Sequence, residues 1–184
     1  MWKNTLISIV SLSLFFSGCS KQPEANNALN DLPQWYQNPT VLGDVYASAG
    51  SAKPNRAQDR ELQKIEATAI ARAELARSLE LRVKDMFKRA TQELGTGDDQ
   101  KLDHAMQYVT KQVSDVTLEG SYQKKLYVDP DTEILYALVV IDESRLKQTL
   151  KQNIATSLHD EEALWQKFQA TQMWQELDDE TGKK

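Results

Sequence analysis

The sequence predicts an α+β fold in which a small, mostly antiparallel three-stranded sheet packs against a long amphipathic helix. Three observations predict this fold. A segment that ends at Gly95 carries apolar residues at spacings of three and four over many turns, which is typical of a long helix. A short strand-like segment precedes it, and two more strand-like segments joined by a turn follow a second helix. The expected order is therefore β-α-α-β-β-α, followed by a C-terminal helical tail.

The amino-terminal residues have the layout of a secretory signal. Lys3 supplies a positive charge, residues 6–16 are apolar apart from serines, and two small residues lead directly into Cys19. The apolar run is about a dozen residues long, which is shorter than the roughly 20 that span a membrane. Small residues followed by a cysteine resemble the bacterial lipobox, in which the thiol is acylated, the chain is cut before the cysteine and the new amino group is acylated. We therefore expect residues 1–18 to be a lipoprotein signal peptide.

Cys19 is the only cysteine of the chain, and it is the predicted lipidation site. Two or more acyl chains anchor a protein stably on a bilayer, whereas a single chain binds reversibly. The alternative is an ordinary signal peptide that leaves a free thiol, but a lone thiol in an oxidising compartment invites mispairing. In bacterial lipoproteins, an Asp directly after the lipidated cysteine resembles a signal for retention in the inner membrane. This chain has Ser20 at that position. We expect a lipid anchor in the outer membrane, on its periplasmic face.

The charge of the chain excludes nucleic acid as a partner. Removal of residues 1–18 takes one of 22 basic residues and none of 27 acidic residues, which leaves a net charge of about −6. The remaining Lys and Arg residues are interleaved with acids, whereas nucleic-acid binding depends on clustered basic residues. Residues 20–32 are polar and poor in large apolar side chains. Residues 19–32 are therefore expected to be the lipidated amino terminus and a short flexible linker.

Residues 33–158 are expected to form one α+β domain. Pro33 and Pro39 stiffen its first segment, and Trp35 and Tyr36 are expected to anchor that segment onto the core. The same two aromatic residues are also the candidates for a small-ligand or glycan site, but no convergent polar groups accompany them. We therefore favour the core position for both.

The first strand is expected over residues 44–52, where small side chains let a helix approach closely. Asn55 and Gln58 have the spacing of a capping box, so the long helix is expected to open there. Ala69 and Ala73 are expected where helix and sheet approach most closely. The full apolar stripe of this helix consists of Leu62, Ile65, Ala69, Ala73, Ala76, Leu79, Val83, Met86, Ala90 and Leu94.

The second half of the domain contains a helix, a hairpin and a further helix. Asp98 can cap the second helix, and strands are expected over residues 117–128 and 133–142, joined by an Asp-Pro-Asp-Thr turn. The latter strand is apolar on both faces, as a central strand should be. Asp142 or Ser144 then opens the last helix of the domain. The buried side of the first hairpin strand is expected to carry Leu118, Tyr122, Leu126 and Val128.

No catalytic or metal-binding constellation stands out along the chain. His104 and His159 are the only histidines, and neither has a second histidine at metal-ligand spacing. The glycine-containing turn at residues 50–56 lacks the second glycine and the Ser or Thr of a phosphate loop. The acidic turn at residues 129–133 lacks the glycine and the distal glutamate of an EF-hand, which favours a solvated hairpin turn. We expect no enzymatic activity, no cofactor and no metal.

The tail, residues 159–184, presents two opposed apolar patches. At a helical 100° per residue, Leu164, Trp165 and Phe168 fall in one sector. Ala170, Met173, Trp174 and Leu177 fall in roughly the opposite one. Either the helix breaks near residues 169–171, or it is sandwiched between its own domain and a neighbour. Because tryptophan is enriched at energetic centres of interfaces, the hypothesis is that the tail contacts another subunit or partner, with the candidate residues Trp165, Phe168, Trp174 and Leu177.

Taken together, these segments resemble the Lpp-twenty family of outer-membrane lipoproteins. The resemblance covers about residues 33–145 and rests on the cysteine signal, "PQWYQNP", "YASAGSA", the alanine-rich helix "KIEATAIARAELARSLELRV" and the hairpin "LYVDPDTEILYALVVID". It implies a small α+β domain on the periplasmic side of the outer membrane, without known catalytic activity. Members include surface antigens and a flagellar basal-body lipoprotein that multimerises into a ring beneath the outer membrane.

The sequence thus favours a non-enzymatic lipoprotein of the bacterial envelope. Its expected role is structural or in assembly, through self-association as a homo-oligomer or through an envelope protein partner, with a flagellar outer ring as one such assembly. A regulator of a cell-wall synthase is a second hypothesis, although the short linker opposes it because such an activator must cross the peptidoglycan. A lipoprotein that binds a small ligand or glycan is a third.

Overall fold

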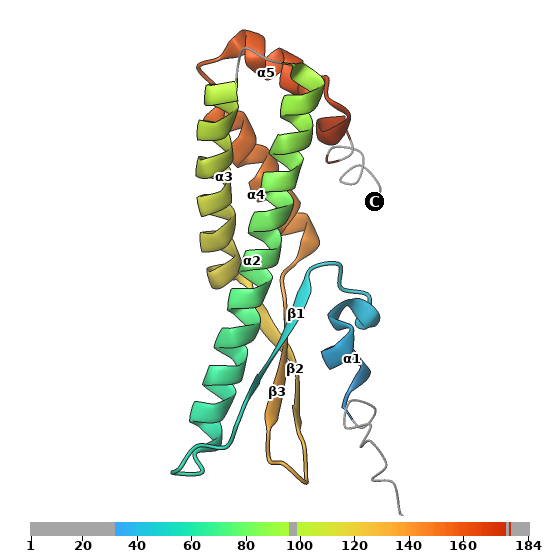
Figure 1. The fold of residues 1–184 in the computed structure, drawn as a ribbon, viewed down its shortest axis with the longest axis vertical. Helices are drawn as coiled ribbons and strands as arrows, with labels where there is room; N and C mark the ends of the chain where they lie inside the picture. Colours follow the sequence, from blue (N-terminus) through green and yellow to red (C-terminus); the bar gives the residue numbers. More distant parts are fainter. Residues whose placement is uncertain (1–31, 96–98, 176, 178–184) are drawn as a thin grey trace, which may run out of the picture.

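The computed structural model describes residues 32–95, 99–175 and 177, so the predicted signal, Cys19 and Asp98 lie outside the described residues. The molecule is elongated, with the sheet at one end, a group of helices at the other, and one long helix running along both (Figure 1). The elements are α1 (Gln34–Gln37), the 3-10 helix η1 (Pro39–Leu42), β1 (Ala47–Ala52), α2 (Arg60–Leu94), α3 (Asp99–Gly120), β2 (Tyr122–Val128), β3 (Leu135–Val140), α4 (Glu143–Ser157) and α5 (Glu162–Gln169). The predicted α+β fold class and element order are confirmed.

The sheet is antiparallel and has the strand order β1-β3-β2. Every residue of the central strand β3 is buried, as its apolar sequence predicts. The predicted start of β2 is wrong, because α3 continues through residues 117–120 instead of giving way to a strand. Thr117 is buried within α3 and its hydroxyl donates to the carbonyl oxygen of Val113 at 2.7 Å, which satisfies the side chain inside the helix.

One face of the sheet is covered by the amino-terminal segment. Tyr136, Leu138 and Val140 of β3 pack there with Trp35, which is buried, and with the half-buried Tyr36. The rings of Tyr36 and Tyr136 meet edge to face with their centroids 4.5 Å apart. The predicted anchoring role of Trp35 and Tyr36 is therefore confirmed.

The other face of the sheet packs against the first half of α2. A Cβ atom added at Gly50 of β1 would lie 2.5 Å from the carbonyl oxygen of Ala67 and 2.5 Å from the backbone nitrogen of Ala71. Strand and helix backbones are therefore in direct contact at this point. The prediction that Ala69 and Ala73 occupy the closest approach is wrong, since both are exposed.

The physical reason for this error is that α2 buries different sides in its two halves. Its first half turns Gln63, Ala67 and Ala71 toward the sheet, and its second half buries a stripe against the other helices. At 3.6 residues per turn the two buried sides point roughly 150° apart. The predicted stripe is correct in the second half of α2, where Ala76, Leu79, Val83 and Ala90 are buried. It is wrong in the first half, where the predicted residues Leu62, Ile65, Ala69 and Ala73 are exposed.

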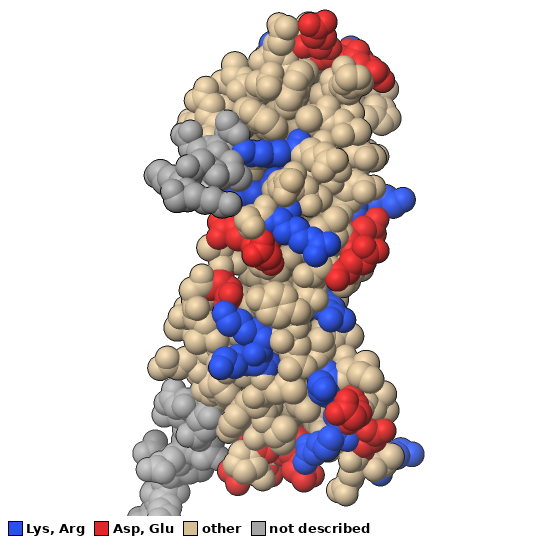
Figure 2. All heavy atoms as spheres, turned by 180° about the vertical axis from the view of Figure 1, so that it is seen from behind, with Lys and Arg blue, Asp and Glu red and all other residues tan. Residues whose placement is uncertain are grey.

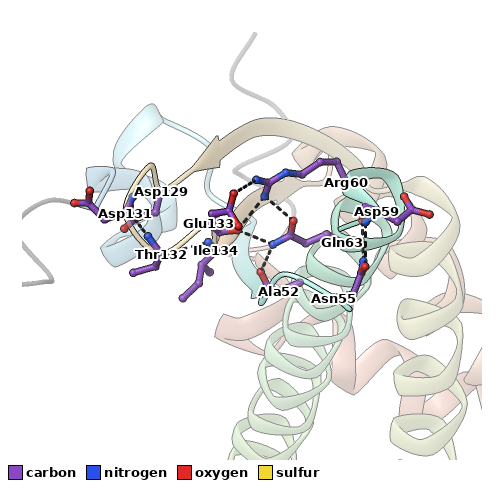
Figure 3. A network of polar contacts seen from close by, with 10 residues as sticks. All are labelled: Ala52, Asn55, Asp59, Arg60, Gln63, Asp129, Asp131, Thr132, Glu133 and Ile134. Atoms are coloured by element: carbon purple, nitrogen blue, oxygen red, sulfur yellow. Dashed lines mark hydrogen bonds and ion pairs between the residues drawn. The ribbon is translucent and has the colours of Figure 1, made fainter. Parts of the chain in front are cut away.

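A polar network fixes the beginning of α2 to the β2–β3 turn (Figure 3). The helix begins at Arg60 with Asp59 as its N-cap, so the predicted capping box at Asn55 is wrong; the Asn55 side chain instead bonds both backbone groups of Asp59. The Gln63 amide nitrogen donates to the carbonyl oxygens of Ala52, at 2.9 Å, and Glu133, at 2.8 Å. One buried side chain thereby joins α2, β1 and the turn.

The remaining helices form the far end of the molecule. The second half of α2 packs with α3, α4 and the residues of α5, where the rings of Phe87 and Phe168 lie 5.6 Å apart. Gly95 ends α2 with a positive φ of 78°, as predicted for a helix stop. Asp142 is the N-cap of α4, one of its two predicted start residues. Among the described residues, no helix has the length and apolar character needed to cross a membrane.

Candidate interaction surface

Several large apolar side chains remain exposed at the sheet end of the molecule. In α2 they include Leu62 and Ile65, which are 52% and 62% exposed. In β2 they include Leu126 and Val128, at 40% and 39% exposed, and Leu118 near the end of α3 adds a further one. We call these five residues the sheet-end apolar surface. They come from three elements at one end of the molecule, and large exposed apolar side chains are candidates for contact with other molecules.

The β2 part of this surface is exposed because α2 packs over β1 and β3 and does not cover β2. Leu126 and Val128 pair with Ala137 and Leu135, and these two partners pack against Ala67 of α2. Directly paired residues share a face of the sheet. Leu126 and Val128 therefore belong to the α2-covered face, at its open margin.

The predicted buried side of this strand is consequently wrong. A register shift between Gln123 and Lys125 interrupts the alternation of the strand. Tyr122, before the shift, pairs with Val140 and lies on the face covered by the amino-terminal segment, whereas Leu126 lies on the other face. One extra residue thus separates side chains that strict alternation places together.

The α2 part of the surface is exposed because α3 is shorter than α2. The Ser114 hydroxyl of α3 donates to Glu80, and the Arg72 side chain donates to the carbonyl oxygen of Ser121, one residue past the end of α3. The turns of α2 that precede Arg72 therefore extend beyond its neighbour. Their outward side carries Leu62 and Ile65 together with the exposed Ala69 and Ala73.

Charged side chains surround this apolar region without concentrating one sign. Arg60 pairs with Glu133 at 3.1 Å, and Lys64 lies 3.5 Å from Glu61. On the face drawn in Figure 2, acidic and basic side chains are interspersed along the molecule among uncharged atoms. Exposed apolar side chains among charges of both signs are more typical of a protein–protein interface than of a nucleic-acid interface.

The four predicted tail residues are brought together at the opposite end of the molecule. Phe168 is fully buried and Leu177 is 8% exposed, so both belong to the core of their own chain. Trp165 and Trp174 are half-buried, and their rings meet edge to face with centroids 5.0 Å apart. Of the two alternatives posed by the sequence, the structure shows the helix break: α5 ends at Gln169, and both apolar patches turn onto the same core.

The polar groups singled out in the sequence occupy structural positions. Asp129 accepts hydrogen bonds from the backbone of Asp131 and Thr132, and these bonds hold the pKa of the Asp129 carboxyl below its usual value. Such contacts define a tight hairpin turn. In residues 32–95, 99–175 and 177, no three His, Cys, Asp or Glu side chains are grouped so that they could hold a metal ion. Burial raises the pKa of Tyr136 inside the aromatic cluster.

Sequence reasoning missed the sheet-end apolar surface because its α2 members read as core positions. Leu62, Ile65, Ala69 and Ala73 have the spacing of a buried stripe, yet no element of the described chain covers them. The signal that identifies them is the mismatch between a core-like pattern and an exposed position. We found no protein-family model and no curated protein that matches this chain.

Proposed function

We propose that this protein is a non-enzymatic lipoprotein of the bacterial outer membrane, similar to the Lpp-twenty family, that acts by self-association or by binding an envelope protein. The observation that carries the proposal is the sheet-end apolar surface, whose α2 residues have the spacing of a buried helix stripe and lie exposed. A second protein surface that covers it would remove apolar area from water, and each buried large aliphatic side chain contributes about 1.5 to 3 kcal/mol relative to exposure.

The position of the predicted anchor supports this proposal. The first described residues lead into α1, which lies beside the sheet rather than beside the distant helices (Figure 1). The segment from Cys19 to Trp35 reaches at most roughly 55 Å when fully extended. A lipid on Cys19 would therefore keep the sheet end and its apolar surface near the membrane, where an assembly partner anchored in the same membrane is also concentrated.

The assembly role is tested with the double variant Ile65→Glu/Leu126→Glu. Both side chains are exposed, so the charges are expected to leave the fold and its melting temperature unchanged while weakening any contact through this surface. Crosslinking in cells, followed by mass measurement of the purified protein, should show loss of the crosslinked species or a lower mass. Leu81→Glu is the matched control, because Leu81 is an exposed leucine in the other half of α2. Identical crosslinks and mass in all three proteins would remove this surface from any assembly role.

The anchor is tested separately with Cys19→Ala. This variant lacks the thiol that would be acylated, so the protein should be released from membranes or fail to mature. Metabolic labelling with a palmitate analogue is expected to mark the unsubstituted protein and not the variant. Equal labelling of both proteins would contradict the lipoprotein assignment while leaving the interaction surface untouched.

A further inference from the structure

A cavity of about 240 Å³ lies in the helical half of the molecule, away from the sheet-end apolar surface. It opens between α2, α4 and the residues that follow α5. Its apolar lining includes Leu79, Val83, Met86, Leu150, Met173 and Leu177. Small-molecule sites are typically concave, mostly apolar and roughly 300–1,000 Å³ in volume, so this cavity lies just below that range and suits a small ligand.

Three charged side chains of α2 stand at this cavity: Arg82, Asp85 and Arg89. Their spacings of three and four residues place them on one side of the helix. Within the part of the chain that the structure describes, neither arginine lies within 4.0 Å of a carboxylate, although the i, i+4 spacing of Asp85 and Arg89 would allow an ion pair. Two cations and one anion leave a local charge of about +1 beside an apolar floor.

Tyr46, just before β1, holds one of these arginines in position. The guanidinium carbon of Arg82 lies 5.4 Å from the centre of the Tyr46 ring, within the range of a cation–π contact. Tyr46 also lines the cavity. The planar guanidinium group offers paired donors that match the two oxygens of a carboxylate. An apolar cavity with such a group at its margin fits a ligand that has one negative charge and a short apolar body.

We propose that this cavity binds a small amphiphilic carboxylate, with its apolar body on the Leu79–Val83 side and its carboxylate at Arg82 and Arg89. The apolar lining and the two arginines contribute different parts of the binding. The apolar lining supplies burial, and the arginines select the anion over a neutral molecule of the same length. This site is independent of the sheet-end apolar surface, so either one can fail without the other.

The experiment titrates octanoate and its neutral counterpart octanol into the mature chain from residue 19, which carries Cys19→Ser so that it takes no lipid. Calorimetry and thermal melts report binding. Octanoate is expected to bind and raise the melting temperature, and octanol to bind about tenfold or more weakly, as loss of a charge-assisted hydrogen bond implies. The double variant Arg82→Gln/Arg89→Gln should bind octanoate no better than octanol. Arg77→Gln, an exposed arginine of α2 that pairs with Glu74, is the matched control and should bind as the unsubstituted protein does.

A third variant tests the cavity itself. Met86 lines the cavity and is half-buried, so Met86→Trp should fill space without removing a core side chain, and it should lower octanoate affinity while the protein still melts cooperatively. Absence of octanoate binding, or equal binding of octanoate and octanol, would overturn the proposal.

Discussion

Gly50 is the residue on which the packing of the sheet against α2 depends. Its missing side chain lets the β1 backbone contact the backbone of Ala67 and Ala71, and both alanines are fully buried. The contact is made by small residues on both sides, so it cannot adjust by rotating a flexible side chain. Close packing of this kind tolerates little added volume.

Gly50→Ala is therefore expected to lower the free energy of unfolding by about 1 to 3 kcal/mol, because the new methyl group must displace backbone. Chemical denaturation of the purified domain measures this change. Ala69→Leu is the matched control: Ala69 is exposed on the same helix, so the larger side chain should leave stability within about 0.5 kcal/mol. A large loss in Ala69→Leu together with a stable Gly50→Ala would show that the helix register is different.

At the scale of elements, the sequence predicts which segments are helices and strands better than it predicts which sides they bury. Gly95 as a helix stop, Asp142 as an N-cap and the fully apolar β3 each reflect a local physical requirement, and the structure contains all three. The buried side of the first half of α2 could not be predicted from such local requirements. Alanines occupy both sides of the helix there, and the large apolar residues Leu62 and Ile65 lie on the side that is exposed.

The long-range contacts that decide between these sides are absent from local patterns. Gln63 is polar and would be assigned to the surface, yet it is 1% exposed because it bonds two carbonyl oxygens from β1 and the hairpin turn. Local sequence patterns also do not identify the sheet-end apolar surface. That Leu126 lies beyond the cover of α2 follows only from the strand order and the register shift in β2.

The cap of α4 gives a prediction with a pH dependence. The Asp142 side chain accepts from the backbone nitrogen of Arg145 at 2.8 Å and from the Ser144 hydroxyl at 2.6 Å, and chiefly the Ser144 bond lowers its pKa. Because the pKa of Asp142 is lower in the folded state than in the unfolded state, its ionised carboxylate stabilises the fold at any pH above the unfolded-state pKa. This contribution is lost as the pH falls through the folded-state pKa. Asp142→Ala should therefore lower the stability of the protein at neutral pH through loss of the N-cap.

Denaturation of Asp142→Ala at several pH values tests this dependence. The stability difference from the unsubstituted protein should shrink as the solution becomes acidic enough to protonate Asp142. Asp142→Asn is the control, since asparagine caps helices about as well and does not titrate in this range. A constant difference for Asp142→Ala across the acidic range would show that the charge of Asp142 contributes nothing to the cap.

At the scale of the whole molecule, the end of the chain closes the helical half. Phe168 and Leu177 bury their side chains there, and the backbone nitrogen of Gln172 donates to Glu93 near the end of α2 at 2.9 Å. An ion pair between Lys101 and Glu161 links the start of α3 to the start of α5. These contacts assign the apolar residues of the tail a role in the core of their own chain.

The double variant Trp174→Ser/Leu177→Ser separates this role from a contact with a partner. Since Leu177 is buried and Trp174 packs on two aromatic rings, the variant should lose about 2 kcal/mol or more of stability and melt earlier. Thermal melts of the monomeric fraction measure this. An unchanged melt combined with a lower molecular mass in solution would instead assign these two residues to an interface between subunits.

The pairing of β1 with β3 has a consequence for how the chain folds. Ala52 pairs with Leu135, so this half of the sheet forms only after more than eighty intervening residues have been brought into place. Closing so large a loop is slow, whereas the α2–α3 pair and the β2–β3 hairpin involve neighbours in sequence. During synthesis the amino terminus emerges first, so the backbone hydrogen-bonding groups of β1 stay unpaired until β3 has been made. The sequence of β1, Ala-Ser-Ala-Gly-Ser-Ala, has low hydrophobicity and low β-propensity, and a strand of this composition is a poor template for aggregation during that interval.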